Sequence, residues 1–129
     1  MAIERFEDIQ GWQAARKLTN MVFEASEKGQ FAKNFRLRDQ IQGAGISSMA
    51  NIAEGFDCET DAEFIRFLSY AFRSATEVQS HLYVAIDQHF TTQEEFDRIY
   101  AQAKETKNLI GGFMRYLRSS PKGKRKQKP

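Results

Sequence analysis

Cysteine, proline and long apolar runs are scarce in this chain of 129 residues. It contains a single cysteine, Cys58, and two prolines. One cysteine excludes an internal disulfide framework and a cysteine-based zinc site, and it fits a protein of the reducing cytoplasm. So few prolines, with few clusters of turn-forming residues, argue against an all-β sandwich of many short strands. The longest uncharged stretch before the C-terminal end, Gln40–Ala53, is shorter than the ~20 residues of a membrane span, so no membrane partner is expected.

Acidic residues are missing from the C-terminal end. The formal net charge is only +2, but all 17 acidic residues precede Ser120 and five of the 19 basic residues follow it. Residues 1–119 therefore carry a net charge of −3 and residues 120–129 carry +5. We expect one domain over residues 1–119 and a disordered basic tail over residues 120–129, because the tail has no apolar anchor.

Apolar residues recur with helical spacing in four segments. The segments run from about residue 8 to 28, 34 to 56, 60 to 89 and 92 to 117. We expect Gly29 to end the first helix and Asn34 to cap the second. The runs Thr60–Glu63 and Thr92–Glu95 are capping boxes, in which Thr and Glu side chains satisfy backbone N–H groups at a helix start. The spacing and short connections predict an all-α fold, an antiparallel up-down-up-down four-helix bundle.

The second predicted helix is rich in small residues. Its C-terminal half includes Gly43, Gly45 and Gly55. A glycine inside a helix costs about 0.5–1 kcal/mol relative to alanine. Small residues also allow two backbones to approach closely, so we expect tight contact with a neighbouring helix to offset this cost.

Polar residues form a second feature of this helix. Four of them lie on one stripe of the helix, namely Gln40, Ser47, Asn51 and Glu54. We group Glu77 of the third predicted helix with these four residues. We interpret the set as a structural hydrogen-bond network between helices, with a ligand site as the alternative.

The ionisable side chains do not complete a catalytic or metal site. Glu77 and His81 are four residues apart, but the Glu-x-x-His motif of di-iron bundles is absent, and His89 lies eight residues further on. Carboxylates beside Cys58 disfavour a reactive thiolate. Glu54 and Glu77 have the chemistry of an acid and a base, but no nucleophile accompanies them, so we interpret both as hydrogen-bond acceptors. We predict no enzymatic activity, no cofactor and no metal.

A dense group of cations is the main indication of a partner. Its seven members are Arg115, Arg118, Lys122, Lys124, Arg125, Lys126 and Lys128. Such a group neutralises several phosphates and gives salt-dependent, sequence-independent affinity for RNA or DNA. The alternative is a solubilising tail whose charge complements the C-terminal end of a helix dipole.

Three parts of the sequence resemble a known family. Residues Phe6–Ala15 resemble the opening F-x-D-L-x-V-W-Q-x-A, and Leu37–Ile41 with Ser47–Phe56 resembles the pattern L-x-x-Q-I…S-x-x-x-N-I-A-E-G. Residues Phe64–Ala85 match the third helix of the same family. Over about residues 6–117 the chain resembles the four-helix bundle proteins associated with intervening sequences of bacterial 23S ribosomal RNA genes. A relative of that family is the accessory variability determinant of diversity-generating retroelements.

The resemblance implies a homopentamer with a basic surface. In such an oligomer, Trp12 and the small-residue face of the second predicted helix are candidates for the interface. In the retroelement relative the resemblance implies binding to nucleic acid and to a reverse transcriptase. The family commonly has two arginines after the Gln-Ile pair, where this chain has Gln42 and Gly43. Any contact with nucleic acid would therefore depend more on the tail in this chain.

Two hypotheses follow for function. The first is a non-enzymatic, oligomeric helical module that binds RNA or DNA, chiefly through residues 115–128. The second is a scaffold that docks a partner protein such as a reverse transcriptase, with no direct contact to nucleic acid. Exposed aromatic residues such as Phe72, Tyr83 or Tyr116 would form its docking surface.

Overall fold

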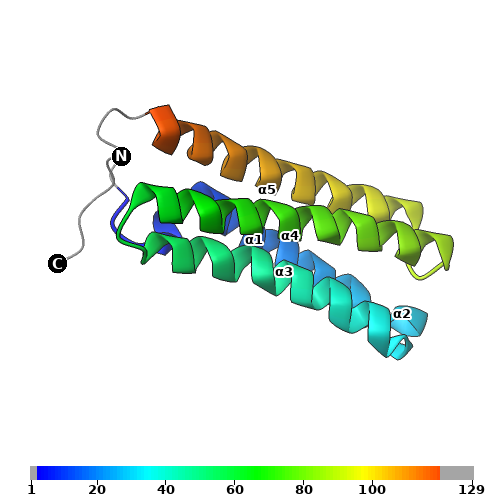
Figure 1. Cartoon of the computed structure of the whole chain (residues 1–129). Helices are drawn as coiled ribbons and strands as arrows, with labels where there is room; N and C mark the ends of the chain where they lie inside the picture. The colour runs from blue at the N-terminus through cyan, green and yellow to red at the C-terminus, as the bar shows by residue number, and fades with distance from the viewer. Residues whose placement is uncertain (1–2, 120–129) are drawn as a thin grey trace.

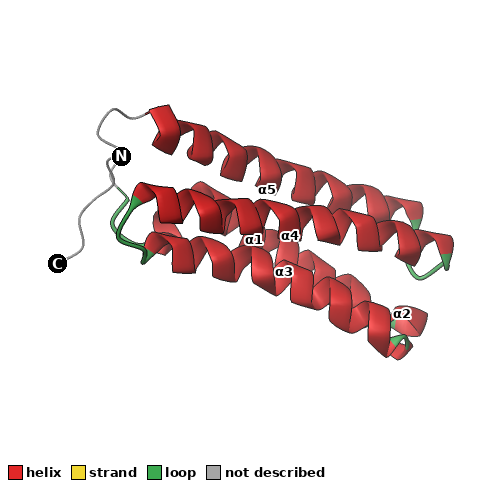
Figure 2. Ribbon diagram, in the orientation of Figure 1, coloured by secondary structure: helices red, strands yellow, loops and turns green. Residues whose placement is uncertain are grey.

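A computed structural model describes residues 3–119, and all the regular structure in that range is helical. It contains a short 3-10 turn and five α-helices (Figure 2). In chain order these are η1 (Phe6–Asp8), α1 (Gln10–Ser26), α2 (Gly29–Lys33), α3 (Phe35–Phe56), α4 (Asp61–Asp87) and α5 (Gln93–Ser119). The all-α prediction is confirmed, and the predicted tail at residues 120–129 lies outside the described residues.

The four long helices lie side by side along the molecule (Figure 1). Helix α4 packs against α3 and α5, and α1 packs against the same two helices. Residues 57–60 connect α3 to α4, and residues 88–92 connect α4 to α5. Because these connections are short, α4 runs opposite to both of its sequence neighbours, as Figure 1 shows. No helix in residues 3–119 is long and apolar enough to cross a membrane.

The predicted helix starts are confirmed by their capping bonds. The Asn34 side chain accepts a bond from the Leu37 N–H at 3.0 Å. At α5 the capping box is complete, since the Glu95 N–H donates to Thr92 Oγ1 and the Thr92 N–H donates to Glu95 Oε1, both at 3.0 Å. Thr60 caps α4 through its own side chain, which accepts a bond from the Glu63 N–H at 3.2 Å.

The prediction for Gly29 was wrong. Helix α1 already ends at Ser26, and Gly29, at φ 58°, opens the short helix α2. This helix places Phe31 in the interior, where its side chain is fully buried. The ring stacks on that of Phe90, with 5.6 Å between the two ring centres. Five residues are too few to display helical periodicity, so the sequence pattern merged this turn with the break between two long helices.

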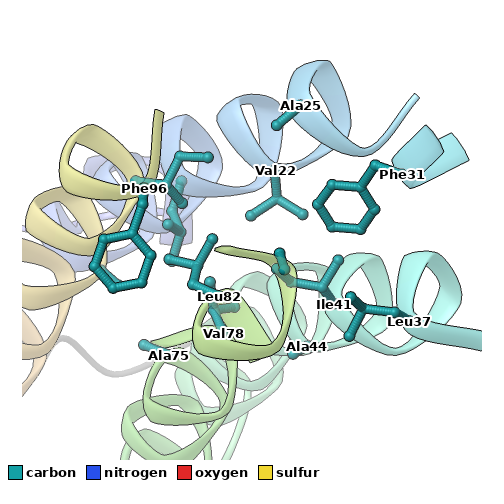
Figure 3. Packing of buried hydrophobic residues seen from close by; sticks show 14 residues of the cluster. Val22, Ala25, Phe31, Leu37, Ile41, Ala44, Ala75, Val78, Leu82 and Phe96 are labelled. Atoms are coloured by element: carbon teal, nitrogen blue, oxygen red, sulfur yellow. The ribbon is translucent and has the colours of Figure 1, made fainter. Parts of the chain in front are cut away.

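The core consists of two apolar clusters along the helices. The first joins α1, α2, α3, α4 and α5 around Phe31, as Figure 3 shows for Val22, Ile41, Leu82 and Phe96. The second lies toward the other end of the long helices. It includes Ile9, Ile52, Phe64, Leu68 and Ile110.

Close helix contact occurs at two of the three glycines of α3. A Cβ on Gly55 would lie 2.8 Å from both Phe64 Cδ1 and Phe67 Cβ of α4, and one on Gly45 would lie 3.2 Å from Thr19 Oγ1 of α1. A Cβ on Gly43 would meet nothing within 4 Å. The expected compensation by packing is therefore confirmed at Gly45 and Gly55 and is wrong at Gly43.

Candidate nucleic-acid interface

The two cations of the predicted group that the structure describes are exposed on the last turns of α5. Arg115 folds back over a glycine pair, with Nη1 3.6 Å from the position a Cβ would take on Gly111 and Nη2 3.7 Å from that on Gly112. Arg118 occupies the last turn, where a positive charge complements the partial negative charge of the helix end. The remaining members lie outside the described residues: Lys122, Lys124, Arg125, Lys126 and Lys128.

A third cation, Lys107, joins α5 to α4. Its Nζ donates a hydrogen bond to Gln79 Oε1 at 3.0 Å and lies 5.0 Å from the centre of the Phe72 ring. Gln79 in turn donates to the Tyr100 carbonyl at 3.5 Å. Lys107 and Gln79 were not predicted from the sequence, because a contact between two helices depends on their register, which the spacing within each helix does not give.

Two more exposed cations lie on α4 near this contact. They are Arg66 and Arg73, and the Arg73 guanidinium carbon is 5.8 Å from the centre of the Tyr70 ring. Residues 64–76 and 106–119 together contain five cations and no acidic residue. Exposed cations thus lie on both of these adjacent helices, in stretches that contain no acidic residue.

The polar residues of α3 divide into two groups. Ser47 Oγ accepts hydrogen bonds from Asn51 Nδ2 and from Ser74 Oγ of α4, both at 3.0 Å. Gln40 and Glu54 are exposed, and no hydrogen bond within residues 3–119 joins their side chains to this group. Ser74, which donates the hydrogen bond between α4 and α3, was not among the residues predicted from the sequence.

Glu77, the remaining member of the predicted network, is also exposed. Its carboxylate pairs with His81 Nε2 at 3.1 Å on the same helix. His89 lies apart from this pair in the α4–α5 connection, where its φ is 65°. The Sγ–H of Cys58 donates to the Glu54 carbonyl at 3.6 Å. Within residues 3–119 no three side chains of His, Cys, Asp or Glu are grouped closely enough to hold a metal ion.

The pKa values of Glu95, Asp8 and Tyr83 are shifted, and none of these residues belongs to the cation group. The backbone N–H of Thr92 and the ammonium of Lys28 lower the pKa of Glu95 below its ordinary value. A backbone hydrogen bond from Glu4 lowers the pKa of Asp8. Hydrogen bonding to Tyr100 raises the pKa of Tyr83.

The aromatic residues considered as docking groups differ in exposure. Tyr83 is 52% exposed and Tyr116 is 57% exposed. Phe72 is partly buried against the second core cluster. Trp12 is also partly buried against that cluster, and its ring meets Phe6 edge-on at 5.1 Å.

Comparison with known proteins identifies the fold and the family. The structure is similar to that of a protein with unknown function from the S23 ribosomal protein family of Bacteroides thetaiotaomicron, with a TM-score of 0.74. The two sequences are 23% identical, and the match covers 81% of this chain and 97% of the other, so it shows a shared fold. No curated protein sequence matches the chain. Residues 7–112 match a family description, which confirms the resemblance seen in the motifs and leaves Arg115 and Arg118 outside the matched range. The chain belongs to the 23S rRNA-intervening sequence protein family.

Proposed function

We propose that this protein is a non-enzymatic, oligomeric helical module of the cytoplasm that binds RNA or DNA without sequence preference. Residues 1–119 form its body, an antiparallel up-down-up-down bundle of α1, α3, α4 and α5. The binding group extends from Arg115 to Lys128. One observation carries the proposal, namely that Arg115 and Arg118 are exposed on an acid-free end of α5 that leads directly into five further cations.

The physical basis is release of counterions from phosphates. Each phosphate that a lysine or arginine neutralises on a single strand lowers the slope of log affinity against log salt by about 0.7. Seven such contacts would give a slope of about −5. The family description, which names an intervening sequence of 23S rRNA, is in keeping with RNA as one ligand.

Oligomerisation would strengthen this binding. We propose a homo-oligomer, a pentamer by the resemblance to the family, in which several copies of residues 120–129 reach one nucleic-acid chain. Once one copy has bound, the other copies are held close to the same nucleic-acid chain, and this high effective concentration raises the overall affinity above that of a single copy. Light scattering measures the mass in solution, and the mass of one chain would contradict this part of the proposal.

A salt titration with a truncated variant tests the proposal. Wild-type protein and a variant ending at Ser119 are compared for retention of labelled RNA on filters between low and high salt. The full chain should bind at low salt, and the truncated variant should bind more weakly with a shallower slope. A control variant with Lys17→Ala and Arg36→Ala, which removes exposed cations elsewhere, should retain most of the binding. Absence of binding at low salt, or identical binding by the truncated variant, would refute the proposed role of residues 115–128.

A second candidate function is supported by the exposure of Tyr83 and Tyr116. In this alternative the helical body docks a partner protein, such as a reverse transcriptase, and does not touch nucleic acid. Large aromatic side chains are typical anchors of protein interfaces. Partner capture that survives nuclease treatment and is lost in Tyr83→Ala would favour the scaffold, whereas loss of the partner on nuclease treatment would favour binding to nucleic acid.

A further inference from the structure

We infer that the surface where the first half of α4 meets the second half of α5 is a path for single-stranded nucleic acid. Its cations are Arg66 and Arg73 on α4, with Lys107 and Arg115 on α5. This inference rests on the proposed function and deepens it, because it assigns part of the binding to the helical body and names the form of nucleic acid.

The contacts between α4 and α5 establish which residues lie at the same level. Phe72 is beside Lys107, and one of its ring carbons lies 3.8 Å from the position a Cβ would take on Gly111. Because the two helices are antiparallel, a step toward the start of α4 matches a step toward the end of α5. Arg73 therefore lies level with Lys107, and Arg66 lies level with Arg115. Two of the cations are therefore on α4 and two on α5, and all four belong to the parts of these helices that lie toward the end of α5 (Figure 1).

The charge of this surface contrasts with that of the rest of the body. Residues 1–119 carry a net charge of −3, yet residues 64–76 and 106–119 hold five of their 14 cations and none of their 17 acidic residues. The nearest acidic residues along the two helices are Glu63, Glu77 and Glu105. Glu77 shares a hydrogen bond with His81 of its own helix. Phosphates are therefore attracted to this surface and repelled from most of the remaining body.

The cations retain donors for a ligand. An ammonium has three N–H donors, and Lys107 uses one of them on Gln79. Arg66, Arg73 and Arg115 are exposed, and no carboxylate within residues 3–119 lies in ion-pair contact with them. A phosphate can thus bind here without first displacing an ion pair.

Aromatic rings beside the cations favour a single strand over a duplex. Tyr70 is 38% exposed and lies next to Arg73, and Phe72 lies beneath Lys107. A ring next to a cation offers a base a stacking surface while the cation holds the adjacent phosphate. The bases of a duplex already stack on one another, so only unpaired bases gain from these rings.

The test measures binding of a fluorescent oligo(dT) probe of about 20 nucleotides by anisotropy, with the same probe in duplex form as comparison. All variants are made in the full chain, and circular dichroism checks their helix content. The variant Arg66→Ala with Arg73→Ala should bind about 25-fold more weakly at 0.1 M salt, since each lost contact removes about 0.7 log units. The matched control is Arg36→Ala with Arg98→Ala, two exposed arginines at the opposite end of the helices, and it should bind like the wild type.

A separate variant, Tyr70→Leu, tests the stacking component. Loss of one stacked base should weaken binding of the single strand at least about fivefold and leave the salt slope unchanged. Equal binding of duplex and single strand, or equal effects of the two arginine double variants, would overturn this inference. If those results appear while truncation after Ser119 still weakens binding, the proposed function stands without the α4–α5 path. If the wild type does not bind at all, both fail.

Discussion

Replacing Gly55 by alanine places a methyl group where α3 touches α4. The new Cβ would lie 2.8 Å from Phe64 Cδ1 and 2.8 Å from Phe67 Cβ, whereas carbon atoms in favourable contact are about 3.5–4.0 Å apart. Phe67 Cβ is fixed to the α4 backbone, and the Phe64 ring is buried in the second core cluster. Relief of the clash therefore requires the two helices to separate.

The expected magnitude comes from two opposing contributions. Alanine is more favourable than glycine inside a helix by about 0.8–1 kcal/mol. Overpacking a close contact costs about 1–3 kcal/mol, and the rigid neighbours place Gly55 at the upper end of that range. We expect Gly55→Ala to lower the free energy of unfolding by about 2 kcal/mol.

Gly43→Ala is the matched control in the same helix. Its Cβ would meet nothing within 4 Å, so only the gain in helix preference remains and the variant should be about 0.5–1 kcal/mol more stable than the wild type. Urea unfolding followed by circular dichroism measures both variants under one set of conditions. Since the chemical change is identical, the difference between them reports packing alone. Equal stability of the two variants would refute the close approach of α3 and α4 at Gly55.

Two other predictions concern α2 and the start of α5. Phe31→Ala should lower the free energy of unfolding by about 3–5 kcal/mol because it empties a fully buried site, whereas Phe35→Ala, at an exposed phenylalanine, should have little effect in the same urea titration. The pKa of Glu95 is lowered in the folded state by the Thr92 N–H and Lys28, so its stabilising contribution is present above its ordinary pKa and is lost as the pH falls. The Tm of Glu95→Gln should therefore fall less than that of the wild type when the pH is lowered from about 5 to about 3. An equal fall in Tm for the two proteins would contradict this prediction.

Local signals in the sequence predicted the helix starts well. Asn34, Thr60 and Thr92 each accept the backbone bond expected of a cap. A cap involves residues within one turn of each other, so its chemistry can be read from neighbouring positions in the sequence. The short helix α2 was not predicted, because it has no repeating apolar pattern and is marked only by the burial of Phe31.

The candidate site was only partly predictable. Arg115 and Arg118 are visible in the sequence as the start of a basic run, and Lys122–Lys128, beyond the described residues, stays a prediction. The polar stripe of α3 was visible too, but the sequence did not show that Ser74 is the partner that reaches Ser47. Hydrogen bonds between helices depend on register, which spacing along one helix does not contain.

The sequence by itself determined the all-α class, the helix starts, the family motifs and the uneven distribution of charge, because each depends on residues that are near one another in the chain. Only the tertiary structure decided that a Cβ on Gly55 would clash with α4 while one on Gly43 would meet nothing within 4 Å, and that Lys107 meets Gln79 and Phe72. It also showed that α4, with Arg66 and Arg73, packs against α5, with Arg115. These facts depend on how α4 lies against α3 and α5, and that arrangement is set by the packing of all four long helices around a shared core.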